Sequence, residues 1–157
     1  MTLDELLACE AIRATMAKCA QAGDSLRGED YAACFTEDGV LESDHSDGAA
    51  GFRHGSRAEI LAWQTAWRSA APTHQTPRSA RFVRHNLTSA KIELTGADTA
   101  SARTYFVVMT DIGPDHCGVY RDVFRRVGED WLIAHRRVRT EWWAPGSHFT
   151  PAEIKPA

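Results

Sequence analysis

The spacing of apolar residues predicts helices at the start of the chain. Over residues 3–22 good helix formers predominate, and apolar residues recur at the spacing of one helix face: Cys9, Ile12, Met16 and Cys19. Gly23 is predicted to end this helix, and a second, shorter helix is predicted over 29–35 with Tyr31 turned inward. The two helices form a hairpin that places Asp24 at its corner.

A third helix is predicted after a polar loop. The loop covers residues 43–55, where Ser, Asp, Gly and His predominate. Ser56 and Glu59 have the spacing of a capping box, so we expect the third helix to begin there. It runs through Trp63 and ends before Pro72, where a linker begins.

From residue 81 onward, alternation of apolar and polar residues predicts β-strands joined by turns that contain glycine. The strands cover 81–94 with a bulge near Thr88, 99–110, 117–127 and 131–143, and a shorter candidate covers 40–42. The turns cover 96–98, 113–115 and 128–130. Helices followed by a long antiparallel meander predict an α+β fold, with the helices packed on one face of a curved sheet.

The length and composition fit a single domain that spans residues 1–157, because 43% hydrophobic and 25% charged residues are ordinary for a globular protein. A formal net charge of -3 gives no electrostatic footprint for a polyanion, so nucleic acid is not expected as a partner. The first twenty residues carry Asp4, Glu5 and Glu10 and no long apolar run. We therefore expect neither a signal peptide nor a membrane partner, and a cytoplasmic location.

The sequence carries no signature of a cofactor, a metal or a covalent nucleophile. The four cysteines lack CxxC spacing, and we expect them to be reduced thiols in the core. Asp44, His45 and Asp47 match no standard metal-ligand spacing, and no phosphate loop or nucleophile elbow is present. Any chemistry is therefore expected to be acid/base chemistry without a metal or cofactor.

His85 is the first candidate for that chemistry. By the two-residue period of a strand, Val83, His85 and Leu87 share the apolar face. A histidine there is either a core residue held by one hydrogen bond or a catalytic base. Asp24, at the end of an apolar helix face, is either the N-cap of the next segment or a carboxylate that orients an imidazole. The spacing along the chain leaves both choices open.

Arg136 is predicted to point inward from the last strand, on the same face as Ala134 and Val138. A buried guanidinium needs a carboxylate or an anionic ligand group, so Arg136 either pairs with Asp122 on the neighbouring strand or binds substrate. Four aromatic residues either fill the core or line a pocket, where a phenol stabilises a developing oxyanion: Tyr31, Tyr105, Tyr120 and Trp63.

Six short segments carry a family resemblance. They are Gly23-Asp24, YAACFTEDGV at 31–40, Arg84-His85-Asn86, GVYRD at 118–122, WLIAHRRV at 131–138 and WWAPG at 142–146. Together they resemble the SnoaL-like branch of the nuclear transport factor 2-like superfamily, over nearly the whole chain. The resemblance implies a cone-shaped half-barrel, in which a curved and mainly antiparallel sheet and the N-terminal helices surround a pocket.

The resemblance also implies a site. Scytalone dehydratase, hexachlorocyclohexane dehydrochlorinase and bile acid 7α-dehydratase, which belong to this group, use an Asp–His pair in the pocket. By that resemblance Asp24 is the paired aspartate, His85 is the general base, and Arg136 matches a pocket arginine of the dehydrochlorinase. The first hypothesis is therefore a cofactor-independent, dehydratase-like lyase or isomerase, in which His85 removes a proton from a small, largely apolar cyclic substrate.

Two other functions stay open at this point. One is a noncatalytic role, as a small-ligand binding module or a protein similar to the β subunit of ring-hydroxylating dioxygenases. The other is epoxide hydrolysis, which limonene epoxide hydrolase relatives carry out with an Asp–Arg–Asp arrangement whose second aspartate the sequence does not locate. The Trp-rich last strand predicts a self-association surface, so we expect a homodimer or homotrimer.

Overall fold

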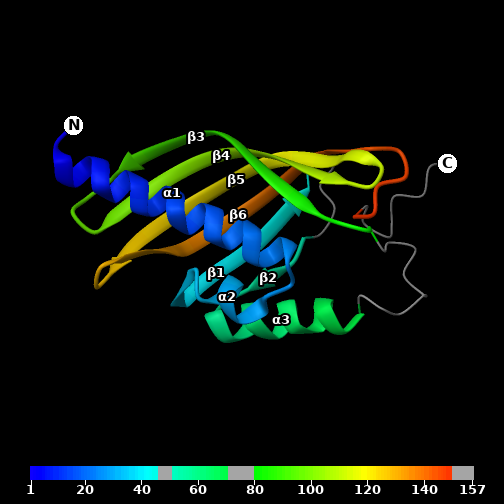
Figure 1. The fold of residues 1–157 in the computed structure, drawn as a ribbon. Coiled ribbons are helices and arrows are strands. Elements are labelled where there is room, and N and C mark those ends of the chain that lie inside the picture. The colour runs from blue at the N-terminus through cyan, green and yellow to red at the C-terminus, as the bar shows by residue number, and fades with distance from the viewer. Residues whose placement is uncertain (46–50, 71–79, 150–157) are drawn as a thin grey trace.

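The computed structural model describes residues 1–45, 51–70 and 80–149 (Figure 1). Its helices are α1 (Leu3–Asp24), α2 (Gly28–Ala32) and α3 (Arg57–Ala70). Its strands are β1 (Phe35–His45), β2 (Arg53–His54), β3 (Arg84–Leu94), β4 (Thr99–Thr110), β5 (Gly113–Val127) and β6 (Asp130–Trp143). Residues 46–50 of the predicted loop and residues 72–79 of the predicted linker lie outside the described residues.

The strands form one curved, unclosed sheet in the order β2-β1-β6-β5-β4-β3. β1 runs parallel to β6, and the other neighbouring strands are antiparallel. Helix α1 crosses one face of the sheet and contacts β3 and β6, whereas α3 packs against α2 and β1 (Figure 1). The predicted α+β fold is confirmed.

Helix α1 carries the candidate residue Asp24 at its C-terminal end. A capping box fixes its start, because the N–H of Glu5 donates to Oγ1 of Thr2 at 3.2 Å and the N–H of Thr2 donates to Oε2 of Glu5 at 2.6 Å. The helix continues through Gly23, so the prediction that this glycine ends it is wrong. Gly23 instead makes room for a neighbouring ring, because a Cβ at this position would lie 3.3 Å from Tyr31.

The second helix is shorter and the first strand longer than the sequence pattern predicts. Helix α2 ends at Ala32, and β1 begins at Phe35 and also includes the first residues of the predicted loop. Phe35 is fully buried and pairs with Ile133 of β6, where the N–H of Ile133 also bonds the Cys34 carbonyl at 2.8 Å. Pairing with the sheet buries the ring and satisfies the backbone, and this outweighs the local helical pattern.

The third helix begins as predicted. The N–H of Glu59 donates to Oγ of Ser56 at 3.2 Å, and Oε2 of Glu59 accepts the N–H of Gly55 at 2.7 Å. The first bond satisfies a donor that a helix start otherwise leaves unpaired, and the second joins Glu59 to the residue that precedes the N-cap. The bulge predicted in β3 is also confirmed, because the register with β4 shifts between Thr88 and Lys91.

The turn between β4 and β5 differs from the prediction. Thr110 pairs with Gly113, so residues 111–112 form the turn and β5 already begins at Gly113. The φ angle of Gly113 is +94°, a conformation that glycine adopts at little cost. Asp115, which the sequence pattern places in a turn, belongs to β5 and is fully buried in the structure. This correction matters for the site described below.

The main core lies between α1 and the sheet and continues under α2 and α3. Its largest fully buried side chains are Phe35, Phe124, Ile12, Leu41, Ile60 and Ile133. Burial of one such side chain contributes about 1.5–3 kcal/mol. All four cysteines are free thiols, as predicted, but only Cys19 and Cys34 are buried, whereas Cys9 and Cys117 are partly exposed. Among the described residues, no helix is long and apolar enough to cross a membrane.

Candidate functional site

Asp24 and His85 are in direct contact although 61 residues separate them. Nδ1 of His85 lies 2.6 Å from Oδ1 of Asp24, and the backbone N–H of His85 donates to Oδ2 of Asp24 at 3.0 Å. Helix α1 ends at Asp24, and β3 presents His85 as its second residue, so the helix terminus and the strand start meet here. Both oxygens of the carboxylate are thus held by one residue.

This geometry fixes the tautomer of His85. Because a carboxylate accepts hydrogen bonds, the neutral tautomer that fits this contact carries its proton on Nδ1 and its lone pair on Nε2. The side chain of Asp24 is 7% exposed and that of His85 is 26% exposed. A buried carboxylate that orients a partly accessible imidazole is an arrangement suited to general-base chemistry at Nε2.

An apolar cluster borders the imidazole of His85. Phe106, Val108 and Tyr120 form its buried part, with Val83, Leu87 and Val138 packed against them. The rings of His85 and Phe106 lie 6.4 Å apart, and Phe106 stacks on Tyr120 at 4.5 Å. Burial raises the pKa of Tyr120, so its phenol stays protonated at neutral pH. The surroundings suit a mostly apolar molecule.

Arg136 forms an ion pair with Asp122. Nε of Arg136 donates to Oδ1 of Asp122 at 2.9 Å, and Nη2 donates to Oδ2 at 2.7 Å. The guanidinium also lies 4.4 Å from the ring centroid of Tyr120, and Nη1 donates to Sγ of Cys19 at 3.3 Å. The sequence leaves two roles open for Arg136, pairing with Asp122 and binding substrate. The contacts in the structure are those of the ion pair with Asp122.

The other predicted aromatic residues do not all gather at His85. Tyr31 packs between Phe35, at 5.6 Å between ring centroids, and Trp63, at 6.3 Å, as part of the main core. Tyr105 is 46% exposed and lies on the opposite face of β4 from Phe106. The prediction that Tyr105 lines the pocket is therefore wrong. Adjacent strand residues point to opposite faces, and Phe106 takes the face toward His85.

A second Asp–His pair, which the sequence pattern missed, lies next to the first. Nδ1 of His116 lies 2.8 Å from Oδ1 of Asp115. The predicted strand began at residue 117, whereas β5 begins at Gly113, so neither member was assigned a direction. Extending the strand back by one residue would have placed His116 on the inward face with Tyr120, since the two differ by an even number of positions.

Asp115 is held by the C-terminal segment that follows β6. Oγ of Ser147 donates to Oδ1 of Asp115 at 2.6 Å, and the N–H of His148 donates to Oδ2 at 2.9 Å. A further hydrogen bond, of 3.3 Å, comes from Oγ1 of Thr110. Burial acts to raise the pKa of Asp115, but the hydrogen bonds from Ser147, His148 and His116 outweigh it and lower the pKa. Asp115 is a buried, ionised anchor.

The two imidazoles face one another. On β4, Val108 pairs with His85 on one side and with His116 on the other, so all three share one cross-strand row. The ring centroids of His85 and His116 are 6.4 Å apart and nearly perpendicular, at 85°. Burial lowers the pKa of His116 below its ordinary value; the hydrogen bond to Asp115 opposes this shift, and the proximity of His85 adds to it.

Comparison with known proteins agrees with this fold. The model of the SnoaL-like domain matches residues 4–137. The chain belongs to the SnoaL-like family. No curated protein matches the sequence.

Solved structures place the SnoaL-like chain among related folds. A putative scytalone dehydratase from Novosphingobium aromaticivorans has a TM-score of 0.70 and 21% identity, covering 90% of this chain and 89% of its own. The β subunit of a putative aromatic-ring-hydroxylating dioxygenase from the same organism has a TM-score of 0.73 and 21% identity, covering 89% and 93%. A protein of unknown function from Mycobacterium tuberculosis has a TM-score of 0.68 and 25% identity, and the match covers 87% of this chain and 77% of its own.

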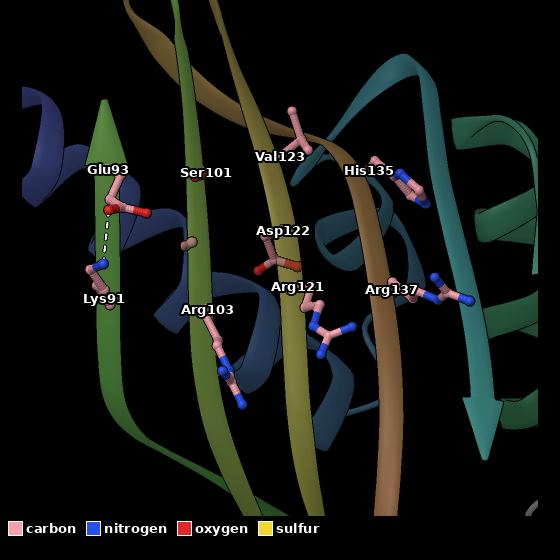
Figure 2. A pocket seen from close by; sticks show the side chains of 10 residues that line it. Lys91, Glu93, Ser101, Arg103, Arg121, Asp122, Val123, His135 and Arg137 are labelled. Atoms are coloured by element: carbon pink, nitrogen blue, oxygen red, sulfur yellow. Dashed lines mark ion pairs between the residues drawn. The ribbon is translucent and has the colours of Figure 1, made fainter. Parts of the chain in front are cut away.

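The outer face of the SnoaL-like sheet carries a groove of about 340 Å³ that is separate from the two Asp–His pairs. Arg103, Arg121 and Arg137 lie side by side on β4, β5 and β6, because the strand register pairs them directly (Figure 2). Glu42 and Asp44 of β1 lie beside Arg137, with Oδ2 of Asp44 3.1 Å from its Nη2. This groove is a basic surface and contains neither His85 nor His116.

Proposed function

We propose that this SnoaL-like protein is a cofactor-independent lyase or isomerase of the dehydratase type, with His85 as general base and Asp24 as its positioning residue. The observation that carries the proposal is the 2.6 Å contact between Nδ1 of His85 and Oδ1 of Asp24. The proposed substrate is small, cyclic and largely apolar, in keeping with the cluster around Phe106 and Tyr120.

The reaction begins at Nε2 of His85, which removes a proton from a carbon next to a carbonyl group. Asp24 stabilises the imidazolium that forms, and general-base catalysis of this kind contributes about 10²–10⁴-fold in rate. The negative charge that develops on the substrate oxygen is stabilised by the neutral phenol of Tyr120. Loss of a group from the adjacent carbon completes an elimination, whereas protonation at a different carbon completes an isomerisation.

Exchange of the α-protons of cyclohexanone in D₂O, followed by NMR, tests the first step without a known natural substrate. The wild-type protein should accelerate exchange over buffer, and His85→Gln should lower that acceleration by about 10²–10⁴-fold. His135→Gln is a matched control, because His135 is a partly exposed histidine on the outer face. Equal exchange with wild type and His85→Gln would exclude His85 as the base.

A noncatalytic role is the second candidate. Its support is the fold similarity to the β subunit of a putative ring-hydroxylating dioxygenase, with a TM-score of 0.73. A subunit of that kind would not accelerate α-proton exchange by itself, and it would co-purify in a fixed ratio with a larger partner chain when the two are expressed together. Exchange by the isolated chain that depends on His85 excludes this role as the complete function.

A further inference from the structure

One row of residues on the outer face of the sheet gathers positive charge. The strand register places four cations side by side on β3, β4, β5 and β6: Lys91, Arg103, Arg121 and Arg137 (Figure 2). The first carboxylate in this row is Glu42 of β1. Like charges directly opposite one another destabilise a sheet, and the whole chain has a formal net charge of -3. The row therefore concentrates cations where neither the fold nor the overall charge favours them.

The two ends of this cationic row are paired with carboxylates. Nζ of Lys91 lies 2.8 Å from Oε1 of Glu93. At the other end, Nη2 of Arg137 lies 3.1 Å from Oδ2 of Asp44, and its Nε lies 3.9 Å from Oε1 of Glu42. Lys91 and Arg137 thus have anionic partners within the protein.

The two arginines at the centre of the row have no anionic partner among the described residues. Arg103 and Arg121 are exposed and pair directly across β4 and β5. Residues opposite one another on a sheet have Cβ atoms about 4.5–5.5 Å apart, so the two guanidinium groups can reach the same ion. Cζ of Arg103 lies 5.4 Å from the centroid of the Tyr105 ring, which offers a π-face but no carboxylate. An anion between the two arginines would offset their mutual repulsion.

Arg103 and Arg121 line the outer groove of about 340 Å³ (Figure 2). Sites for small molecules begin at about 300 Å³, so the groove suits a small ligand. Ser101 and Val123 line the groove in the adjacent row, where they pair directly with each other, and Val123 is 45% exposed. With a rise of about 3.3 Å per residue, this row lies roughly 7 Å from the arginines. The groove thus joins a cationic end to a less polar surface within the length of a small molecule.

We propose that Arg103 and Arg121 bind the phosphate group of a small phosphate monoester, whose organic part lies over Ser101 and Val123. A guanidinium donates two parallel N–H bonds, a geometry that matches the oxygens of phosphate and carboxylate groups. A carboxylate has two oxygens and is satisfied by one guanidinium. A phosphate monoester has three terminal oxygens and close to two negative charges at neutral pH. Two adjacent guanidinium groups therefore favour a phosphate over a carboxylate.

This phosphate site is separate from the proposed reaction. On β4, Arg103 and Phe106 are an odd number of positions apart, so they point to opposite faces of the sheet. Phe106 is the residue that borders His85. Phosphate binding at the outer groove therefore does not depend on the role of His85.

A second copy of the chain is a less suitable occupant of this face. Among the described residues, the carboxylates beside the row are Glu42, Asp44 and Glu93, and each already lies in an ion pair with its own chain. Two such faces packed together would place arginines against one another without free carboxylates to match them. Charge complementarity thus favours an anionic ligand.

Isothermal titration calorimetry with phenyl phosphate tests the site, in a phosphate-free buffer at about 0.15 M salt, where long-range attraction is screened. Wild type should bind one phenyl phosphate per chain, and it should bind benzoate, the matched carboxylate, more weakly. Arg103→Gln and Arg121→Gln should each lower the affinity about 10–100-fold, because each removes charge-assisted hydrogen bonds. Arg13→Gln should leave the affinity unchanged and is the matched control, because Arg13 is an exposed arginine on α1, outside the groove.

Arg121→Lys separates a fitted site from attraction by charge alone. Lysine keeps the positive charge but lacks the planar guanidinium, so this variant should also bind phenyl phosphate more weakly than wild type, though less so than Arg121→Gln. In ¹H–¹⁵N NMR spectra of the wild type, phenyl phosphate should shift the Nε–H signals of Arg103 and Arg121. Thermal melting checks the fold of each variant, and none should melt below wild type, because both arginines are exposed.

Three results would overturn the phosphate site. The first is that wild type does not bind phenyl phosphate; if sedimentation then shows a dimer that Arg121→Gln dissociates, the occupant of this face is a second copy. The second is that benzoate binds as tightly as phenyl phosphate. The third is that Arg13→Gln lowers the affinity as much as Arg103→Gln does, because the attraction would then come from the charge of the whole surface.

Discussion

Replacement of Arg136 by methionine should destabilise the protein strongly, because it leaves a buried carboxylate without its partner. The side chain of Asp122 is 0% exposed and that of Arg136 is 4% exposed, and the pair makes two hydrogen bonds of 2.9 and 2.7 Å. Removing one member of a buried pair costs about 3–5 kcal/mol. For a domain of this size, about 1 kcal/mol lowers the melting temperature by roughly 2–4 °C, so the expected fall is roughly 6–20 °C.

The double variant Asp122→Leu/Arg136→Met should recover most of this loss, since apolar residues of similar volume often replace a buried ion pair at little cost. The methionine also keeps a favourable contact with the ring of Tyr120. As a surface control, Arg125→Met removes an ion pair to the exposed Asp38 and should change stability little. Urea unfolding followed by tryptophan fluorescence measures all four proteins.

A single variant as stable as wild type would refute the interpretation of Arg136 as a buried structural cation. A double variant no more stable than the single one would refute the argument that the unpaired carboxylate causes the loss. The same proteins test the other role left open for Arg136. If the double variant folds and still exchanges α-protons at the wild-type rate, the guanidinium is not needed by the reaction.

Three further predictions follow from the site. Asp24→Asn should lower α-proton exchange by about 10²-fold, because an amide, unlike a carboxylate, can donate to Nδ1 of His85 and so stabilise the tautomer with its proton on Nε2. ¹⁵N NMR of the imidazole reports which tautomer is present. Wild type should lose stability as pH falls below about 6.5, because His116 takes up a proton in the unfolded chain but, with its lowered pKa, not in the folded one. The melting temperatures at about pH 7.5 and 5.5 should therefore differ less in His116→Gln than in wild type. Gly118→Ala should cost about 1–3 kcal/mol or more in urea unfolding, because its Cβ would lie 2.0 Å from the carbonyl oxygen of Arg139.

The periodic elements were predictable because their cause is local. The face of α1 and the meander of strands follow from the spacing of apolar residues, and both are present. Element ends were less predictable, because tertiary pairing sets them. Phe35 continues a helical pattern, yet its burial against β6 makes it the first residue of a strand.

The site was predictable only in part. Strand parity gave an inward His85, and the family resemblance supplied Asp24, which no local pattern joins to a residue 61 positions away. Tyr105 was misplaced although Arg103, two positions earlier on the same strand, marks that face as outward. His116 was missed because Asp115 resembles a turn residue until the C-terminal segment is seen to cover it.

The position of Asp24 also favours function over stability. A carboxylate in the last turn of a helix faces the negative end of the helix dipole, an arrangement that is unfavourable in itself. Residues selected for stability alone normally avoid a carboxylate at a helix C-terminus, and exceptions to such local rules concentrate at functional sites. Here the cost is offset by one residue, His85, through its ring and its backbone N–H. The Asp24 carboxylate at the end of α1 is therefore stabilised by its two contacts with His85. The same contacts hold the imidazole of the proposed base in one orientation.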